Sequence, residues 1–149
     1  MAKDDFTAQE KAAMKERAAE AKADKRAGTK AAKAAADAEA VTAKIAEMGE
    51  ADRVIAEGVH AAVAAAAPDL VPRLWYGMPA YARGKDVVCF YQAAEKFGTR
   101  YGTLGFSDKA ALDDGELWPS AYAVACWTPQ VEGRIMELIR RAAGEPGAD

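Results

Sequence analysis

The chain has 149 residues, which is room for one domain and an extension, and its net charge of −3 arises in residues 41–149, where acidic residues outnumber basic ones by four. An acidic domain argues against binding to a nucleic-acid backbone, which requires a clear basic face. The sequence has no run of about 18 apolar residues and no apolar signal region at its N-terminus, so we expect no membrane partner and predict a cytoplasmic protein.

The first predicted helix begins at a capping box. In Thr7-Ala8-Gln9-Glu10 the Thr hydroxyl satisfies a free backbone N–H and the Glu side chain reaches back, so we expect a helix from about Ala8 to Ala27. A second helix is expected over residues 30–48. Phe6 and Met14 are the only large apolar residues that could anchor the first helix, which is otherwise alanine and charge.

We therefore interpret residues 1–37 as a charged, alanine-rich helical arm. Its like-signed side chains recur every four residues, as Glu16 and Glu20 do, and such neighbours repel slightly. A solvated face is the simpler interpretation, and docking of the arm onto a protein partner of mixed charge is the alternative. The folded domain is predicted over residues 38–143, followed by a loose tail at residues 144–149.

The domain shows apolar stripes with helical spacing and several extended segments. The stripes predict a third helix at about residues 51–66 and a last helix that begins at Thr128 and Pro129. β-Branched and aromatic residues predict extended segments at 74–81, 87–91, 99–106 and 121–127. This order predicts an α+β fold, with an antiparallel sheet of about four to five strands in a meander, flanked by helices on one face.

A tyrosine-bearing segment carries a resemblance to a known family. Trp75-Tyr76-Gly77-Met78-Pro79-Ala80-Tyr81, followed by Val88-Cys89-Phe90, Lys96 and Tyr101, resembles the YdhG-like family of domains of unknown function, in the frataxin-like iron chaperone superfamily. The resemblance covers about residues 41–142. It implies a frataxin-like fold, and it makes iron a candidate ligand because some members are described as iron chaperones for iron–sulfur cluster assembly. Many members have Lys-His where this chain has Lys96-Phe97.

The same segment supplies a candidate ligand-binding groove. We expect aromatic walls and two cations that capture an anion, since Arg offers a two-pronged donor to carboxylate or phosphate. The residues are Tyr76, Met78, Tyr81, Lys96, Arg100 and Tyr101, with the tyrosines as walls and Lys96 and Arg100 as the charge. The competing interpretation is a corner of the core with solvated charges on a strand edge.

The remaining reactive residues form no catalytic constellation. Asp113, Asp114 and Glu116 are typical of a turn, with weak iron binding as the alternative. Cys89 and Cys126 lie in apolar segments and are expected to be buried free thiols, with a disulfide between neighbouring strands as the alternative. We therefore predict a binding module for iron or a small anion rather than an enzyme. Two alternatives stay open: an interaction module that docks through the arm, and an enzyme with Tyr or Lys acid–base chemistry.

Overall fold

A computed structural model describes residues 7–26 and 29–144, apart from the side chains of residues 23–26. The predicted capping box is present, because Thr7 N–H donates to Glu10 Oε1 (2.8 Å) and Glu10 N–H donates to Thr7 Oγ1 (3.0 Å). The elements in chain order are α1 (Ala8–Arg26), α2 (Lys30–Ala46), α3 (Glu50–Ala66), β1 (Val71–Trp75), β2 (Met78–Arg83), β3 (Asp86–Gln92), α4 (Ala94–Phe97), β4 (Gly102–Phe106), β5 (Ala121–Val124) and α5 (Pro129–Ala143).

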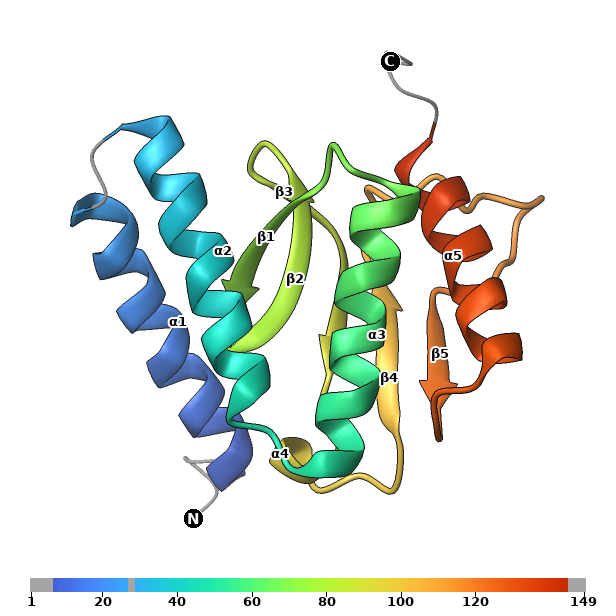
Figure 1. Ribbon diagram of the computed structural model, residues 1–149, viewed down its shortest axis with the longest axis horizontal. Helices are drawn as coiled ribbons and strands as arrows, with labels where there is room; N and C mark the ends of the chain where they lie inside the picture. Colours follow the sequence, from blue (N-terminus) through green and yellow to red (C-terminus); the bar gives the residue numbers. More distant parts are fainter. Residues whose placement is uncertain (1–6, 27–28, 145–149) are drawn as a thin grey trace.

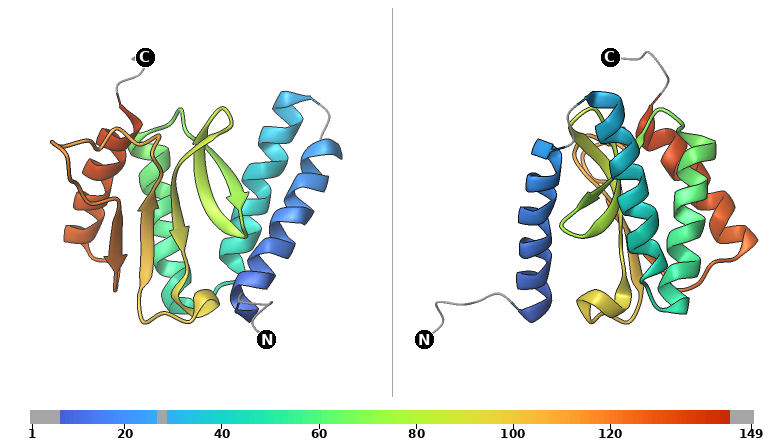
Figure 2. Two further views of the ribbon diagram at one scale, coloured as in Figure 1. Left: turned by 180° about the vertical axis from the view of Figure 1, so that it is seen from behind. Right: turned by 60° about the vertical axis from the view of Figure 1, so that its left-hand side comes forward.

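The strands form one antiparallel sheet in the order β1-β2-β3-β4-β5, so that each strand pairs with its neighbour in the sequence (Figure 1). The predicted α+β class and the meander are confirmed. Helices α2, α3 and α5 cover one face of the sheet, whereas α1 lies at the β1 edge, on the other side of the sheet from α3 and α5 (Figure 2). Of the helices in the described part of the chain, none is long and apolar enough to cross a membrane.

The core lies between the sheet and these three helices, and each predicted apolar stripe faces it. The buried members are Val41 and Ile45 of α2, Ile55, Val59 and Val63 of α3, and Ile135, Leu138 and Ile139 of α5. α2 runs without a break through the predicted boundary between residues 37 and 38. None of the described residues of α1 belongs to this buried cluster, so α1 packs against a core that the other elements build.

The aromatic segment at residues 74–81 is a hairpin rather than one extended strand. β1 and β2 are joined by Tyr76 and Gly77, whose φ angles of 53° and 77° are both left-handed, as in a type I′ turn. Glycine adopts this conformation without strain, whereas for a residue with a Cβ such as Tyr76 it costs about 1–2 kcal/mol. Met78 and Pro79 belong to β2, so the turn precedes them.

Asp52 of α3 explains α4, a short helix that the sequence pattern does not predict. Its carboxylate is 6% exposed and accepts three hydrogen bonds: from Tyr91 Oη (2.8 Å) and Ala94 N (2.9 Å) at Oδ1, and from Glu95 N (3.0 Å) at Oδ2. Burial, together with the bond to Asp52, raises the pKa of Tyr91 above its ordinary value, so the hydroxyl keeps its proton and donates. The N-terminus of α4 is thus capped by a residue far away in the sequence.

We expect Asp52→Ala to lower the free energy of unfolding by about 2–4 kcal/mol, because it leaves three donors without their acceptor. Tyr91→Phe removes only one of these bonds and should cost about 1 kcal/mol. Asp108→Ala, at an exposed position, is the control. The measurement is urea denaturation followed by circular dichroism, and equal losses for the Asp52 and Tyr91 variants would contradict the capping role.

Candidate functional site

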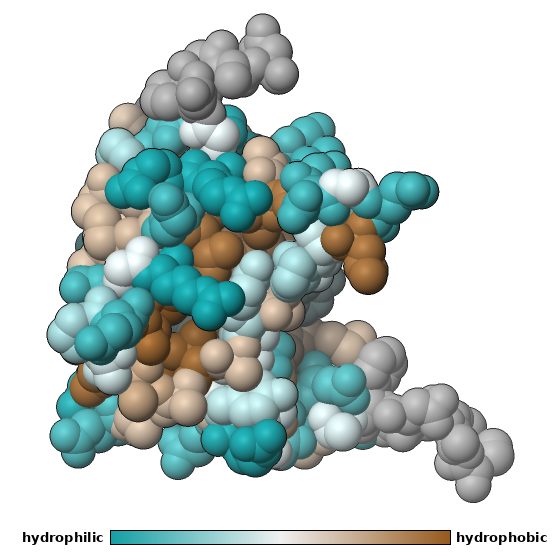
Figure 3. Space-filling model, turned by 90° about the vertical axis from the view of Figure 1, so that its right-hand side faces the viewer, coloured by the Kyte–Doolittle hydropathy of each residue, from teal (hydrophilic) through white to brown (hydrophobic). Residues whose placement is uncertain are grey.

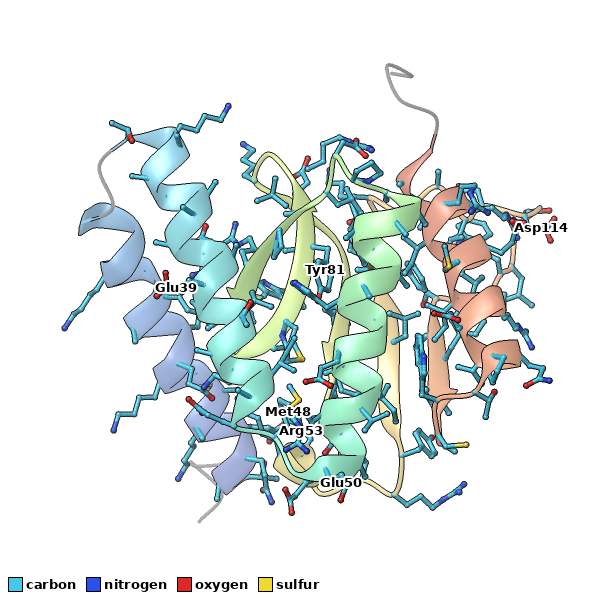
Figure 4. The ribbon with its side chains drawn as sticks, viewed as in Figure 1. Glu39, Met48, Glu50, Arg53, Tyr81 and Asp114 are labelled. Carbon is cyan, nitrogen blue, oxygen red and sulfur yellow. The ribbon has the colours of Figure 1, made fainter. Side chains whose placement is uncertain are left out.

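The six residues predicted to line one groove do not share one hollow. Met78 and Lys96 line a pocket of about 280 Å³ beneath the β1–β2 hairpin. Tyr81 is buried between β2 and α3 (Figure 4) and lines a different hollow beside α3. Because Met78 and Tyr81 are three positions apart on one strand, their side chains leave opposite faces of the sheet. The prediction of a single groove is therefore wrong.

The other three predicted residues lie apart from both hollows. Arg100 stacks on Tyr101, with its guanidinium carbon 5.0 Å from the ring centre. Tyr76 is 37% exposed and meets Trp75 edge to face, with the ring centres 5.1 Å apart. Arg100 and the rings of Tyr101 and Tyr76 therefore contact neighbouring side chains in the sequence. They do not join Lys96 in the predicted anion-binding groove.

The pocket at Met78 and Lys96 is crossed by an ionic bridge from α1. Glu16 accepts hydrogen bonds from Lys44 Nζ (2.8 Å) and from Lys96 Nζ. Burial acts to raise the pKa of Glu16, but the bonds from the two lysines outweigh it and hold that pKa below its ordinary value. Lys96, predicted to capture an anionic ligand, is thus bound to a carboxylate of its own chain.

A second carboxylate of α1 binds the β1–β2 turn. Glu20 Oε2 accepts from Gly77 N–H at 2.9 Å, and burial raises the pKa of Glu20 above its ordinary value although this bond acts to lower it. The described part of α1 makes little apolar contact with the domain, because its buried apolar residue is the small Ala13, whereas Met14 is 47% exposed. Phe6, the other predicted anchor, lies outside the described residues. The expectation of a solvated acidic face is therefore wrong for Glu16 and Glu20, which dock α1 onto the domain.

We expect Glu16→Gln to loosen α1 without unfolding the domain, because it removes the charge that both lysines bind. The penalty should be about 1 kcal/mol, which corresponds to roughly fivefold faster hydrogen exchange of α1 amides with α3 unchanged. Glu39→Gln, on the exposed side of α2 (Figure 4), is the matched control. Equal α1 exchange in wild type and Glu16→Gln at low salt would contradict docking through this bridge.

One hollow among the described residues has several cationic side chains in its lining and is called the basic hollow below. Its volume is about 700 Å³, and it lies between α1, α2 and the face of the sheet away from α3. The lining residues are Arg17, Lys30, Lys33, Ala34, Asp37, Val71, Arg73, Trp75, Ala82, Gly84, Lys85 and Val87. Five of these side chains are cationic and one is a carboxylate, Asp37, which pairs with Lys33 at 2.7 Å.

The first turn of α2 adds to this positive potential. Thr29 caps the helix by accepting from Ala32 N, and the first turn contains Lys30 but no acidic residue. A helix carries partial positive charge at its N-terminus, so cations there are disfavoured by about 0.3–1 kcal/mol each. Lys30, the first residue of α2, is thus placed against the preference of its own helix, and it lines the hollow.

The other chemistry-bearing groups of the described chain are separate from these sites. Asp113, Asp114 and Glu116 are exposed, and Asp114 lies at the outer end of the molecule (Figure 4). Among the side chains that the structure describes there is no group of three or more His, Cys, Asp or Glu that could hold a metal ion. Cys89 is buried, which raises its pKa to about 12, but Cys126 is exposed because β5 ends before it, contrary to prediction.

The only histidine of the sequence forms a pair that the sequence does not reveal. His60 Nδ1 lies 3.0 Å from Tyr81 Oη at the wall of a hollow of about 290 Å³ lined otherwise by apolar side chains. Burial lowers the pKa of His60 below its ordinary value of 6.5 and raises that of Tyr81. At neutral pH the pair is therefore an uncharged imidazole and a protonated hydroxyl.

This lowered pKa predicts a pH dependence of stability. The folded state binds the His60 proton less readily than the unfolded state, so its contribution is present above the ordinary pKa of 6.5 and is lost as the pH falls through the folded pKa. We expect wild type to lose more stability than His60→Gln between pH 7 and pH 5, measured by urea denaturation. Parallel stability curves for the two proteins would show that His60 is not the group that titrates.

A further hollow, of about 350 Å³, lies between β5 and α5, where hydrophobic side chains gather on that face of the molecule (Figure 3). Its wall is formed mainly by Tyr122, Val124, Val131, Ile135 and Leu138, with Arg134 as its charged residue. This hollow offers apolar area but few groups that would orient a ligand. The basic hollow is the better candidate site because its charged groups converge.

Comparison with protein-family models, with curated proteins and with solved structures found no match for this chain. The resemblance to YdhG-like domains therefore stays a prediction. Sequence reasoning missed the basic hollow because its cations come from two helices, a strand and a turn. One signal was visible, namely two lysines at the start of a predicted helix with no acidic residue beside them.

Proposed function

We propose that this chain is a binding module for small polyanions, with the basic hollow as its site. The observation that carries the proposal is the convergence of five cationic side chains and the first turn of α2 on one hollow. Among the described lining residues one carboxylate, Asp37, opposes them, and Arg17 also pairs with Glu20, which lies outside the lining (3.8 Å). In a chain with a net charge of −3, a concentration of cations of this kind is a local feature and not a product of composition.

The energetics of the free protein also support this proposal. Like charges held around one hollow repel, and Lys30 also opposes the dipole of α2. A bound anion would offset the repulsion between the cations and would also interact favourably with the N-terminus of α2. Helix N-termini and arginine or lysine donors bind phosphate and carboxylate groups. Ligand binding would then stabilise the folded chain, because the unfolded chain has no such site.

Docking of the arm onto a protein partner is supported less well. Glu16 and Glu20, the carboxylates that such a partner would read, already bind Lys44, Lys96 and the hairpin turn of the same chain. Iron binding and acid–base catalysis stay predictions from the family resemblance and from residue type. The polyanion site is the function that the arrangement of charged side chains supports best.

We expect the double variant Lys30→Gln/Lys85→Gln to bind sodium tripolyphosphate roughly 100-fold more weakly than wild type, at about tenfold for each charged donor removed. The two lysines are exposed and lie on different elements, so the fold should be retained. Isothermal titration calorimetry without divalent cations measures the affinity, and Lys109→Gln, exposed in the segment after β4, is the matched control.

Two further measurements distinguish binding at this site from nonspecific electrostatic attraction of the anion. Added KCl should weaken tripolyphosphate binding to wild type, because screening acts on the exposed cations. Lys30→Gln alone should raise the free energy of unfolding by about 0.3–1 kcal/mol while it weakens binding, since it removes a cation from a helix N-terminus. The same loss of affinity in Lys109→Gln, or no binding by wild type at millimolar tripolyphosphate, would overturn the proposal.

A further inference from the structure

The basic hollow has a charged end and an aromatic end. Lys30 and Lys33 come from the start of α2, and Lys85 from the turn between β2 and β3. Figure 1 shows the start of α2 and this turn at the same end of the molecule. Three ammonium groups and the positive end of α2 are therefore grouped at one end of the hollow.

The other end is reached along β1. Val71 and Trp75 both line the hollow, since alternate residues of a strand face the same side. Val71 pairs with Ala82, close to the turn that bears Lys85, so it lies at the charged end. With a rise of about 3.3 Å per residue, Trp75 lies about 13 Å further along the strand. The hollow is thus elongated, with an indole ring far from the lysines.

The ring at that end is fixed in position and partly exposed. Trp75 meets Phe90, with ring centres 5.2 Å apart, and Tyr76 edge to face at 5.1 Å. An aromatic ring that is already held costs little entropy when a planar group stacks on it. Arg73 lies between the two ends on β1. Arg17 pairs with Glu20 (Nη1 to Oε1, 3.8 Å), and Glu20 also binds the turn that follows Trp75, so Arg17 lies at the aromatic end.

We infer that the polyanion bound in the basic hollow is a nucleoside di- or triphosphate; this inference rests on the function proposed above. The phosphates lie among Lys30, Lys33 and Lys85 at the N-terminus of α2, where backbone and side-chain donors favour them. The base stacks on Trp75, and Arg73, between the two ends, binds the phosphate nearest the sugar. A ligand with a flat ring at one end and a phosphate chain at the other matches the polarity of the hollow.

The test compares adenosine triphosphate with inorganic tripolyphosphate, both without divalent cations, on the full chain. Wild type should bind adenosine triphosphate about 5- to 100-fold more tightly, the range expected for stacking of one base on an aromatic side chain. Trp75→Leu should bind both with similar affinity while keeping its affinity for tripolyphosphate. Trp118→Leu, a tryptophan that packs against the core outside this hollow, should keep the preference.

Trp75→Phe guards against a local folding defect, because it keeps an aromatic face against Phe90 and should keep part of the preference. Fluorescence in a Trp118→Phe/Trp127→Phe background should show quenching of Trp75 by adenosine triphosphate and much less by tripolyphosphate. Equal affinities of wild type for the two ligands would overturn the nucleotide inference and leave the polyanion site intact. A full preference in Trp75→Leu would overturn it as well, whereas binding of neither ligand would overturn the proposed function itself.

Discussion

Two carboxylates of α1 determine where the outer wall of the basic hollow stands. Glu16 binds Lys44 and Lys96, and Glu20 binds the backbone of the β1–β2 turn, while the described part of α1 adds little apolar contact. Arg17 lies between these two glutamates in the sequence and lines the hollow, so its position depends on the same contacts. Partly exposed ion pairs orient a helix more than they stabilise it, and salt screens them.

The fold separates some of the charges that the sequence mixes, although Arg17 still pairs with Glu20 and Lys33 with Asp37. Residues 1–40 contain almost equal numbers of acidic and basic residues, which suggests a neutral arm. In the folded chain Glu16 and Glu20 face the hairpin and α4, whereas Arg17, Lys30 and Lys33 face the hollow. Net charge describes long-range behaviour such as solubility, but recognition depends on which side chains share a hollow.

Much of the fold can be predicted from local sequence signals. The caps at Thr7, Thr29 and Thr128 and the apolar stripes place the long helices within a few residues, and alternation places the strands. The hairpin turn was hidden because a tyrosine occupies a left-handed position that usually marks glycine or asparagine. α4 was hidden because its cap, Asp52, comes from α3.

The candidate site was predicted less well, for a geometric reason. Residues near in sequence, such as Met78 and Tyr81, leave opposite faces of one strand, so a compact motif need not make a compact site. The basic hollow joins Arg17, Lys30 and Lys85, which are brought together only by packing of α1 and α2 against the sheet. No local rule connects those positions, so the hollow becomes visible only when the register of β1 with β2 is known.

The two edges of the sheet differ in how they are covered. α1 and α2 flank the β1 edge, whereas the outer edge of β5 pairs with no strand in the described part of the chain. β5 and the residues after it, Ala121 to Trp127, contain no charged side chain, and Ala123 is exposed. Natural proteins usually protect such an edge with a lysine, a proline or a bulge. The outer edge of β5 is therefore where we expect pairing with a strand of another chain, and its length of four residues limits such pairing.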